Sequence, residues 1–266
     1  MVPLYEAKLI QTLWNAERVK NSQEGWTLVS GAKSPWYFNI RPLGCFPRLF
    51  SDVSHAMAEL VNEHRGIDLL VGIEMAGIPL VGAVSPILLE KYGREIKIGY
   101  TRPLRHKGLK PEDIVRYLEE EGIDAAYGQK SLVEVRFSQG DNVAIFDDMA
   151  TNLGSKIVAR YIALWDAGQR GINLSCKTIL YFLNRGAKNK ELGLAFRDKA
   201  PELFPEELEV DYVLEFNEHL PLLRKAMRPQ EYELISQYQK DPEQFQDQTA
   251  QKKVFAQVAK DLGLEA

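Results

Sequence analysis

The feature that most constrains the fold is an apolar run that ends in two adjacent acids. The run Val143–Phe146 is followed by Asp147 and Asp148, and then by a turn of small residues, Thr151–Ser155. Four apolar residues in succession are typical of a strand that is covered on both faces of a parallel sheet. The spacing of apolar residues after Gly154 predicts a helix. Such a junction between a strand and a helix is where α/β proteins bind ligands.

The residue types at this junction indicate a class of ligand. The unpaired N–H groups of a helix start, from Thr151 to Ser155, could hold a phosphate monoester. Two carboxylates beside a phosphate would repel it, unless they accept hydrogen bonds from a sugar diol or lie near Mg²⁺. A phosphorylated ribose meets these needs. The alternative is that Asp147 and Asp148 form only a strand-end turn and a helix cap.

The rest of the chain alternates between strand and helix patterns. Short apolar runs predict strands at residues 67–73, 96–100, 132–137, 142–146 and 178–183. Helical spacing follows Ala76 and ends near Gly93, and it resumes after Gly154. This order predicts an α/β fold with a central parallel sheet flanked by helices.

Four segments resemble the motifs of one family. Val143–Ser155 resembles the phosphoribosyl-diphosphate (PRPP) motif of type I phosphoribosyltransferases, and Thr27–Asn39 resembles the N-terminal motif of its orotate branch. Gly72–Leu80 resembles the family's pyrophosphate loop, and Tyr181–Ala187 resembles its late strand. The resemblance implies a phosphoribosyltransferase-like domain over residues 1–225, with an N-terminal hood. The same resemblance implies a lid and a helical insertion within this domain at about 101–130. A helical C-terminal extension would follow at 226–266.

The resemblance also assigns a binding site. PRPP would contact Ala76, Gly77, Asp147, Asp148, Thr151, Asn152, Leu153, Gly154 and Ser155. Mg²⁺ is the implied cofactor, and no protein side chain is assigned as its ligand. The two acids would meet the ribose hydroxyls and stabilise a cationic transition state. Taken alone, the small residues Ala76 and Gly77 have a second interpretation, in which they only start a helix.

A basic stretch after the second predicted strand is the candidate catalytic lid. Arg102, Arg105 and Lys107 carry charge that could neutralise departing pyrophosphate, so they join the two acids as candidate catalytic residues. The alternative is a solvated basic loop. The helix predicted after the lid, from Pro111 to Gly122, would be either a specificity element or a surface insertion.

The resemblance places base recognition at five residues. These are Lys33, Tyr37, Phe38, Thr151 and Arg185, of which Arg185 would meet the carboxylate of orotate. A planar pyrimidine needs backbone donors and acceptors, an apolar wall and, for orotate, a cation. The aromatic side chains have a second interpretation as core residues.

Several positions depart from the family pattern. Leu153 stands where the PRPP loop normally has glycine, and Val29 stands where the N-terminal motif has lysine. In the lid, Thr101 replaces an arginine and Lys107 replaces a histidine. A leucine at a position of positive φ would cost about 1–2 kcal/mol.

Two classes of function therefore remain open. The first is transfer of ribose 5-phosphate from PRPP to orotate, giving orotidine 5'-monophosphate and pyrophosphate in pyrimidine nucleotide biosynthesis, or transfer to a different base. The second is a non-catalytic or weakly catalytic regulatory protein that binds PRPP or a nucleotide.

Composition restricts the partners and the setting. The net charge of −4 and the pI near 5.7 argue against nucleic acid as a partner. Two cysteines, no signal-peptide pattern and no long apolar run predict a cytoplasmic protein that does not bind a membrane. The apolar stripe Val254–Leu262 would either pack on the parent domain or form a contact in a homodimer, which is the expected assembly.

Overall fold

The fold is described from a computed structural model of the chain. It describes residues 26–27, 33–34, 40–104, 110–120, 131–186, 208–224 and 229–246. These residues fall into two compact units, one formed by residues 1–45 and 215–266 and the other by residues 46–214.

The larger unit is built on a six-stranded sheet of order β5-β4-β3-β6-β7-β8. The central pairs β3–β4, β3–β6 and β6–β7 are parallel, and β5 pairs with β4 in antiparallel fashion. The strands are β3 (Leu69–Gly72), β4 (Lys97–Thr101), β5 (Val133–Glu134), β6 (Asn142–Ala150), β7 (Ser175–Asn184) and β8 (Glu209–Glu215), whose last residue begins the other unit. The predicted α/β fold with a central parallel sheet is confirmed.

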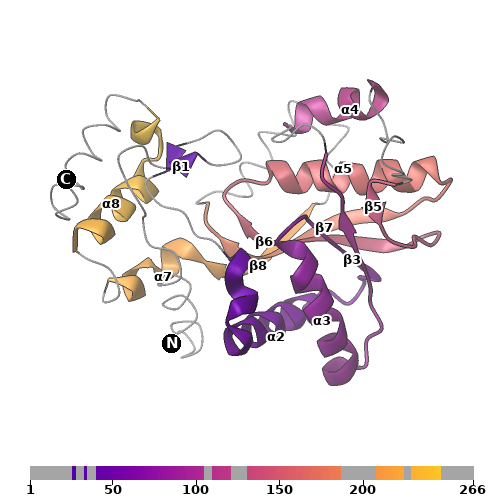
Figure 1. The fold of residues 1–266 in the computed structure, drawn as a ribbon, viewed down its shortest axis with the longest axis horizontal. Helices are drawn as coiled ribbons and strands as arrows, with labels where there is room; N and C mark the ends of the chain where they lie inside the picture. Colours follow the sequence, from indigo (N-terminus) through magenta and orange to yellow (C-terminus); the bar gives the residue numbers. More distant parts are fainter. Residues whose placement is uncertain are drawn as a thin grey trace. The chain divides into compact units, whose positions relative to one another are not determined.

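Helices cover both faces of this sheet, as Figure 1 shows. Helices α2 (Pro47–Glu63) and α3 (Gly77–Tyr92) pack together on one face. Helix α5 (Gly154–Gln169) packs on the other face, against β6 and β7. Helix α4 (Pro111–Glu120) packs on α5, where Ile114 and Leu118 are buried. The predicted insertion is therefore a helix that buries its apolar face in the core of this unit.

The helix boundaries follow local sequence signals. Helix α3 ends at Gly93, whose φ of 64° lies in the left-handed region that glycine adopts without strain. The predicted stop at this glycine is confirmed. The N–H of Gly93 donates to the carbonyl of Leu89 at 3.0 Å, which satisfies an orphan carbonyl of the last turn.

Two strands differ in length from their predictions. Strand β6 runs on to Ala150, so both acids lie inside the strand rather than after it. Strand β5 is much shorter than the predicted 132–137, and side chains of α5 and of its C-cap residue also bind the backbone of this segment. Asp166 accepts the N–H of Leu132, and Arg170 donates to the carbonyl of Val133.

The smaller unit holds short elements. They are the antiparallel strands β1 (Trp26–Thr27) and β2 (Lys33–Ser34), the 3₁₀ helices η1 (Arg41–Cys45) and η4 (Glu243–Phe245), and the helices α7 (Phe216–Leu223) and α8 (Pro229–Lys240). Helices α7 and α8 pack together, and the rings of Tyr238 and Phe245 meet edge to face at 5.3 Å. The part of the predicted C-terminal extension that is described is therefore helical, whereas the stripe Val254–Leu262 lies outside the described residues.

Within the described ranges, no helix is long and apolar enough to cross a membrane.

Candidate functional site

The site lies where the order of strands reverses. Strand β3 is central, and the chain continues from it to β4 on one side and later to β6 on the other. In open α/β sheets, this switch point is where ligands bind, beyond the carboxyl ends of the strands. The register pairs Gly72 with Phe146, and the N–H of Ile73 donates to the carbonyl of Phe146 at 2.9 Å. The two predicted phosphate loops therefore begin side by side.

The β3–α3 loop is closed by contact between backbones. A Cβ at Gly77 would lie 2.7 Å from the carbonyl oxygen of Phe146 and 3.0 Å from Cα of Gly72, so only glycine fits there. The N–H of Gly77 donates to the carbonyl of Ile73 at 2.8 Å. Ala76 lies half-buried just before the first helical residue. Gly77 thus packs the start of α3 against β6. This packing does not depend on any contact between Ala76 and a ligand.

A side chain of β4 fixes the same loop from the other side. Thr101 is 3% exposed, and its hydroxyl accepts the N–H of Glu74 at 3.2 Å. The residue that stands in place of the family's lid arginine is therefore a buried anchor for the β3–α3 loop.

The β6–α5 loop is organised by a buried ion pair. Nζ of Lys156, on the first turn of α5, lies 2.6 Å from Oδ2 of Asp147, and both side chains are less than a tenth exposed. The other oxygen of Asp147 accepts the N–H of Asp148 at 2.9 Å. Asp148, the next residue of β6, is half-buried. The two acids that the sequence pairs therefore have different surroundings.

The turn that follows accommodates Leu153 without backbone strain. Its dihedral angles are φ −87° and ψ 0°, and its side chain is fully buried in the core. A leucine would strain this turn only at a positive φ, and the φ of Leu153 is negative. The Asn152 side-chain oxygen accepts the N–H of Gly154 at 3.1 Å, and the N–H of Ile157 donates to the carbonyl of Leu153. By helix geometry, the N–H groups of Ser155 and Lys156 then remain as orphan donors of the first turn.

The end of β7 lies beside this loop. The register pairs Ala150 with Asn184, and the N–H of Arg185 donates to the carbonyl of Ala150 at 2.8 Å. Arg185 is buried, and Thr151 is half-buried. The structure thus brings two of the predicted base-binding residues to the same edge of the sheet as the two acids.

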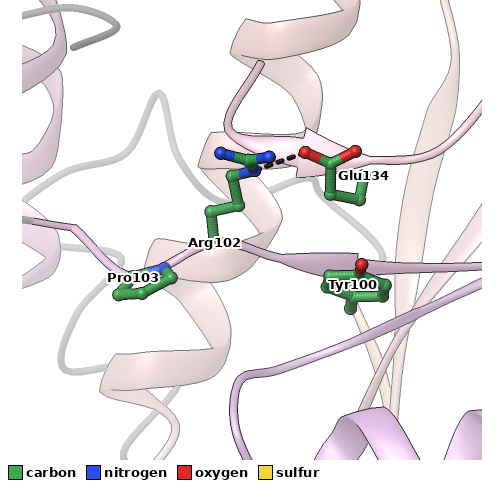
Figure 2. A pocket seen from close by; sticks show the side chains of 4 residues that line it. All are labelled: Tyr100, Arg102, Pro103 and Glu134. Atoms are coloured by element: carbon green, nitrogen blue, oxygen red, sulfur yellow. Dashed lines mark hydrogen bonds and ion pairs between the residues drawn. The ribbon is translucent and has the colours of Figure 1, made fainter. Parts of the chain in front are cut away.

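Only the first part of the predicted lid is described. Arg102 follows β4 directly, and its Nε forms an ion pair with Glu134 of β5. These two residues line an open pocket of about 320 Å³ together with Tyr100 and Pro103, and Figure 2 shows the guanidinium of Arg102 turned toward Glu134. Arg105, Lys107, Tyr37, Phe38 and Val29 lie outside the described residues, as does the side chain of Lys33.

The segment around β5, which follows the insertion in the sequence, is held by hydrogen bonds and ion pairs at the C-terminal end of α5. Arg170 forms an ion pair with Asp166, donates to the carbonyls of Val133 and Val135, and lies over the ring of Phe137 at 5.2 Å. Burial raises the pKa of Asp166, although the N–H of Leu132 and the charge of Arg170 oppose this shift. These contacts hold β5, and with it Glu134, in place.

The described residues contain no group of three or more side chains that could hold a metal ion by themselves. Mg²⁺ is commonly bound by one or two carboxylates together with phosphate oxygens of the substrate. The half-buried carboxylate of Asp148, near the end of β6, is of the kind that such a shared site uses.

Comparison with known proteins gives the family context. No protein-family model matches the chain. The orotate phosphoribosyltransferase of Ruegeria sp. is 30% identical over 140 residues, which cover 52% of this chain and 51% of that protein. That of Cereibacter sphaeroides is 29% identical over 138 residues. Over about half of its length, the chain is therefore similar in sequence to orotate phosphoribosyltransferases. It spans about half the length of the curated relatives it matches.

Solved structures are similar to this chain in fold. The UMP synthase of Leishmania donovani aligns with a TM-score of 0.60 and 22% identity, covering 88% of this chain and 42% of that protein. An orotate phosphoribosyltransferase of Francisella tularensis aligns with a TM-score of 0.54 and 19% identity, covering 87% of this chain and 98% of that one. The sheet and its helices thus form the type I phosphoribosyltransferase fold.

Sequence reasoning missed two residues of this phosphoribosyltransferase-like site. Lys156 falls in the apolar stretch after Gly154, where a lone lysine is usually exposed. Its position one turn into the helix that follows the acids was the available signal. Thr101 had been noted only as a missing arginine, and nothing in the sequence indicated its contact with Glu74.

Proposed function

We propose that this protein transfers ribose 5-phosphate from PRPP to a pyrimidine base such as orotate, releasing pyrophosphate. The observation that carries the proposal is the pairing of the two loops across the switch point, with Asp148 and Arg185 at the same edge of the sheet. A phosphate on the first turn of α5 and a pyrophosphate beside α3 would place the ribose between them.

The chemistry follows from this arrangement. A ring nitrogen of the base attacks the anomeric carbon of PRPP and gives up its proton to water or to the departing pyrophosphate, while the new C–N bond forms and the C–O bond to pyrophosphate breaks. The carboxylate of Asp148 would accept a hydrogen bond from the ribose diol and stabilise positive charge on the sugar. Orphan N–H groups at Ser155 and Lys156 would bind the 5'-phosphate. Mg²⁺ would neutralise phosphate charge when bound.

The Arg102 side chain would cover the pyrophosphate only after it leaves Glu134. Because the guanidinium is about 39% exposed, this ion pair is weak and exchange costs little. Arg105 and Lys107 would complete the cover. The proposal therefore includes a rearrangement of Arg102 on binding.

A steady-state assay with orotate, PRPP and Mg²⁺ tests the proposal. We expect formation of orotidine 5'-monophosphate, with turnover reduced at least a hundredfold in Asp148→Asn. Glu218→Gln, which changes an exposed acid of α7, is the matched control and should retain turnover. Full activity in Asp148→Asn would contradict the site, and product formation with another base in place of orotate would revise only the substrate.

A second candidate is a regulatory protein that binds PRPP or a nucleotide without turning it over. Two observations favour it. Arg102 is ion-paired with Glu134, and Asn152 already accepts the N–H of Gly154, a donor that a phosphate could otherwise use. Tight PRPP binding by calorimetry, with no product from any pyrimidine base, would support this candidate over the enzyme.

A further inference from the structure

The buried ion pair of the β6–α5 loop gives Asp147 a role that its place in the PRPP motif does not suggest. Both oxygens of its carboxylate have partners inside the protein. Oδ2 lies 2.6 Å from Nζ of Lys156, and Oδ1 accepts the N–H of Asp148 at 2.9 Å. For Asp147 to meet a sugar diol, it would have to leave a buried ammonium group without its counter-charge.

The ammonium group of Lys156 is equally well satisfied. Its three donors have three acceptors, namely Oδ2 of Asp147, the carbonyl of Met149 at 2.5 Å and Oγ of Ser155 at 3.3 Å. The residue is 5% exposed, so water does not replace these contacts easily. The lysine thus connects the strand, the turn and the first turn of the helix.

Asp148 lies on the opposite side of the strand. Successive side chains of a strand point to opposite faces, so Asp147 and Asp148 cannot share one environment. Asp148 is half-buried, whereas Asp147 is 7% exposed. The hydrogen bond from its own N–H to Asp147 fixes the backbone from which its side chain projects.

We propose that Lys156 is a positioning residue that holds Asp147 away from the ribose, so that Asp148 is the one carboxylate of this pair that the chain offers to a ribose diol. This inference rests on the proposed function and makes it more specific. The Lys156–Asp147 pair is neutral as a whole, so the site carries one negative charge where two adjacent acids would carry two. Less charge beside the phosphate favours ligand binding without Mg²⁺.

The experiment compares variants of the full chain by calorimetric titration with ribose 5-phosphate and PRPP, with and without Mg²⁺. The variants are Asp148→Asn, Asp147→Asn, Lys156→Met and the double variant Asp147→Asn/Lys156→Met. Urea unfolding of each variant at several temperatures identifies one temperature at which all of them are folded without urea. We expect the loss of affinity to be at least tenfold larger in Asp148→Asn than in the double variant.

Lys156→Met supplies a signature that a merely structural role would not give. Without the lysine, the charge of the Asp147 carboxylate is no longer neutralised and adds negative charge to the site. Affinity for ribose 5-phosphate without Mg²⁺ should therefore fall at least fivefold in folded Lys156→Met. Adding Asp147→Asn should recover most of this loss. Equal losses of affinity in the double variant and in Asp148→Asn would overturn the proposal.

The unfolding equilibrium separates this inference from the proposed function. In the double variant, the change in the unfolding constant should be at least tenfold smaller than the product of the two single changes. The pair Lys97–Asp141, whose lysine is 40% exposed, is the matched control and should show a smaller coupling. If the wild type bound neither ribose 5-phosphate nor PRPP, the proposed function would be wrong. The coupling between Lys156 and Asp147 in the unfolding equilibrium would still decide the role of Lys156. Additive effects of the two substitutions on the free energy of unfolding would overturn the proposed role of Lys156.

Discussion

The two loops at the switch point form the same turn from strand to helix by different means. In the β3–α3 loop, Gly72 and Gly77 bring backbones into direct contact, and no side chain of the two takes part. In the β6–α5 loop, the position expected to be glycine is Leu153, which is buried, and a side-chain ion pair between Lys156 and Asp147 holds the turn. Comparable loops can therefore begin their helix either on backbone contact between glycines, with the hydroxyl of Thr101 as an added anchor, or on packed and ion-paired side chains.

The largest effect should come from breaking the ion pair of the β6–α5 loop. Lys156→Met leaves the carboxylate of Asp147 buried without a counter-charge, which should lower the free energy of unfolding by about 3–5 kcal/mol. Lys97→Met removes a lysine at the same 2.6 Å distance from Asp141, whose side chain is 8% exposed, but that lysine is itself 40% exposed and its loss should cost less, about 2 kcal/mol. Urea unfolding measures the free energy of unfolding of both variants. Equal costs would mean that the pair Lys156–Asp147 matters no more for stability than the pair Lys97–Asp141.

The next effect tests whether Leu153 supports the turn or strains it. Leu153→Gly introduces the residue that the family pattern has, but it deletes a fully buried side chain from the core. We expect a loss of about 3 kcal/mol in the free energy of unfolding. A gain in stability would mean that the leucine strains the loop, and the comparison between the two loops would then lose its basis.

A smaller effect should follow from adding one methyl group to the β3–α3 loop. Gly77→Ala places Cβ 2.7 Å from the carbonyl oxygen of Phe146, so backbone must shift, at a cost of about 1–3 kcal/mol. Gly82→Ala, in the same helix with open space around its Cβ, should instead stabilise the protein by about 0.5–1 kcal/mol. Thermal unfolding of the two variants should therefore shift in opposite directions.

The smallest effect concerns the packing of β7 against α5, at the end of β7 far from the ion-pair loop. Burial raises the pKa of Cys176 to about 12 from an ordinary value of 9.0. The folded state thus favours the protonated thiol, and this stability is present below pH 9 and is lost as the pH rises toward 12. Between pH 8 and pH 10, wild type should lose about 1 kcal/mol more than Cys176→Ala. Parallel slopes in urea unfolding would contradict this account of the buried thiol.

Much of the fold could be predicted from the sequence, because its signals are local. The apolar run Val143–Phe146 and the helical spacing after Gly154 indicated β6 and α5, and Gly93 indicated the end of α3. The contacts around β5 could not be predicted in this way, since they involve Asp166 and Arg170, which lie more than 30 residues away in the sequence.

The site was only partly visible in the sequence for a similar reason. Adjacency of Asp147 and Asp148 suggested one shared role, whereas the strand places them on opposite faces and Lys156 pairs with only one of them. Leu153 was expected to strain the loop if its φ were positive, whereas its φ of −87° is ordinary. The assignments of Arg105, Lys107, Tyr37 and Phe38 stay predictions, because these residues lie outside the described ranges.

A crystal structure of the full chain with PRPP bound tests the account most directly, through the contacts of the two acids. The account predicts that the ribose diol lies within hydrogen-bond distance of Asp148, while Nζ of Lys156 keeps its contact of about 2.6 Å with Asp147. A structure in which Asp147 has left Lys156 to bind the diol would contradict it.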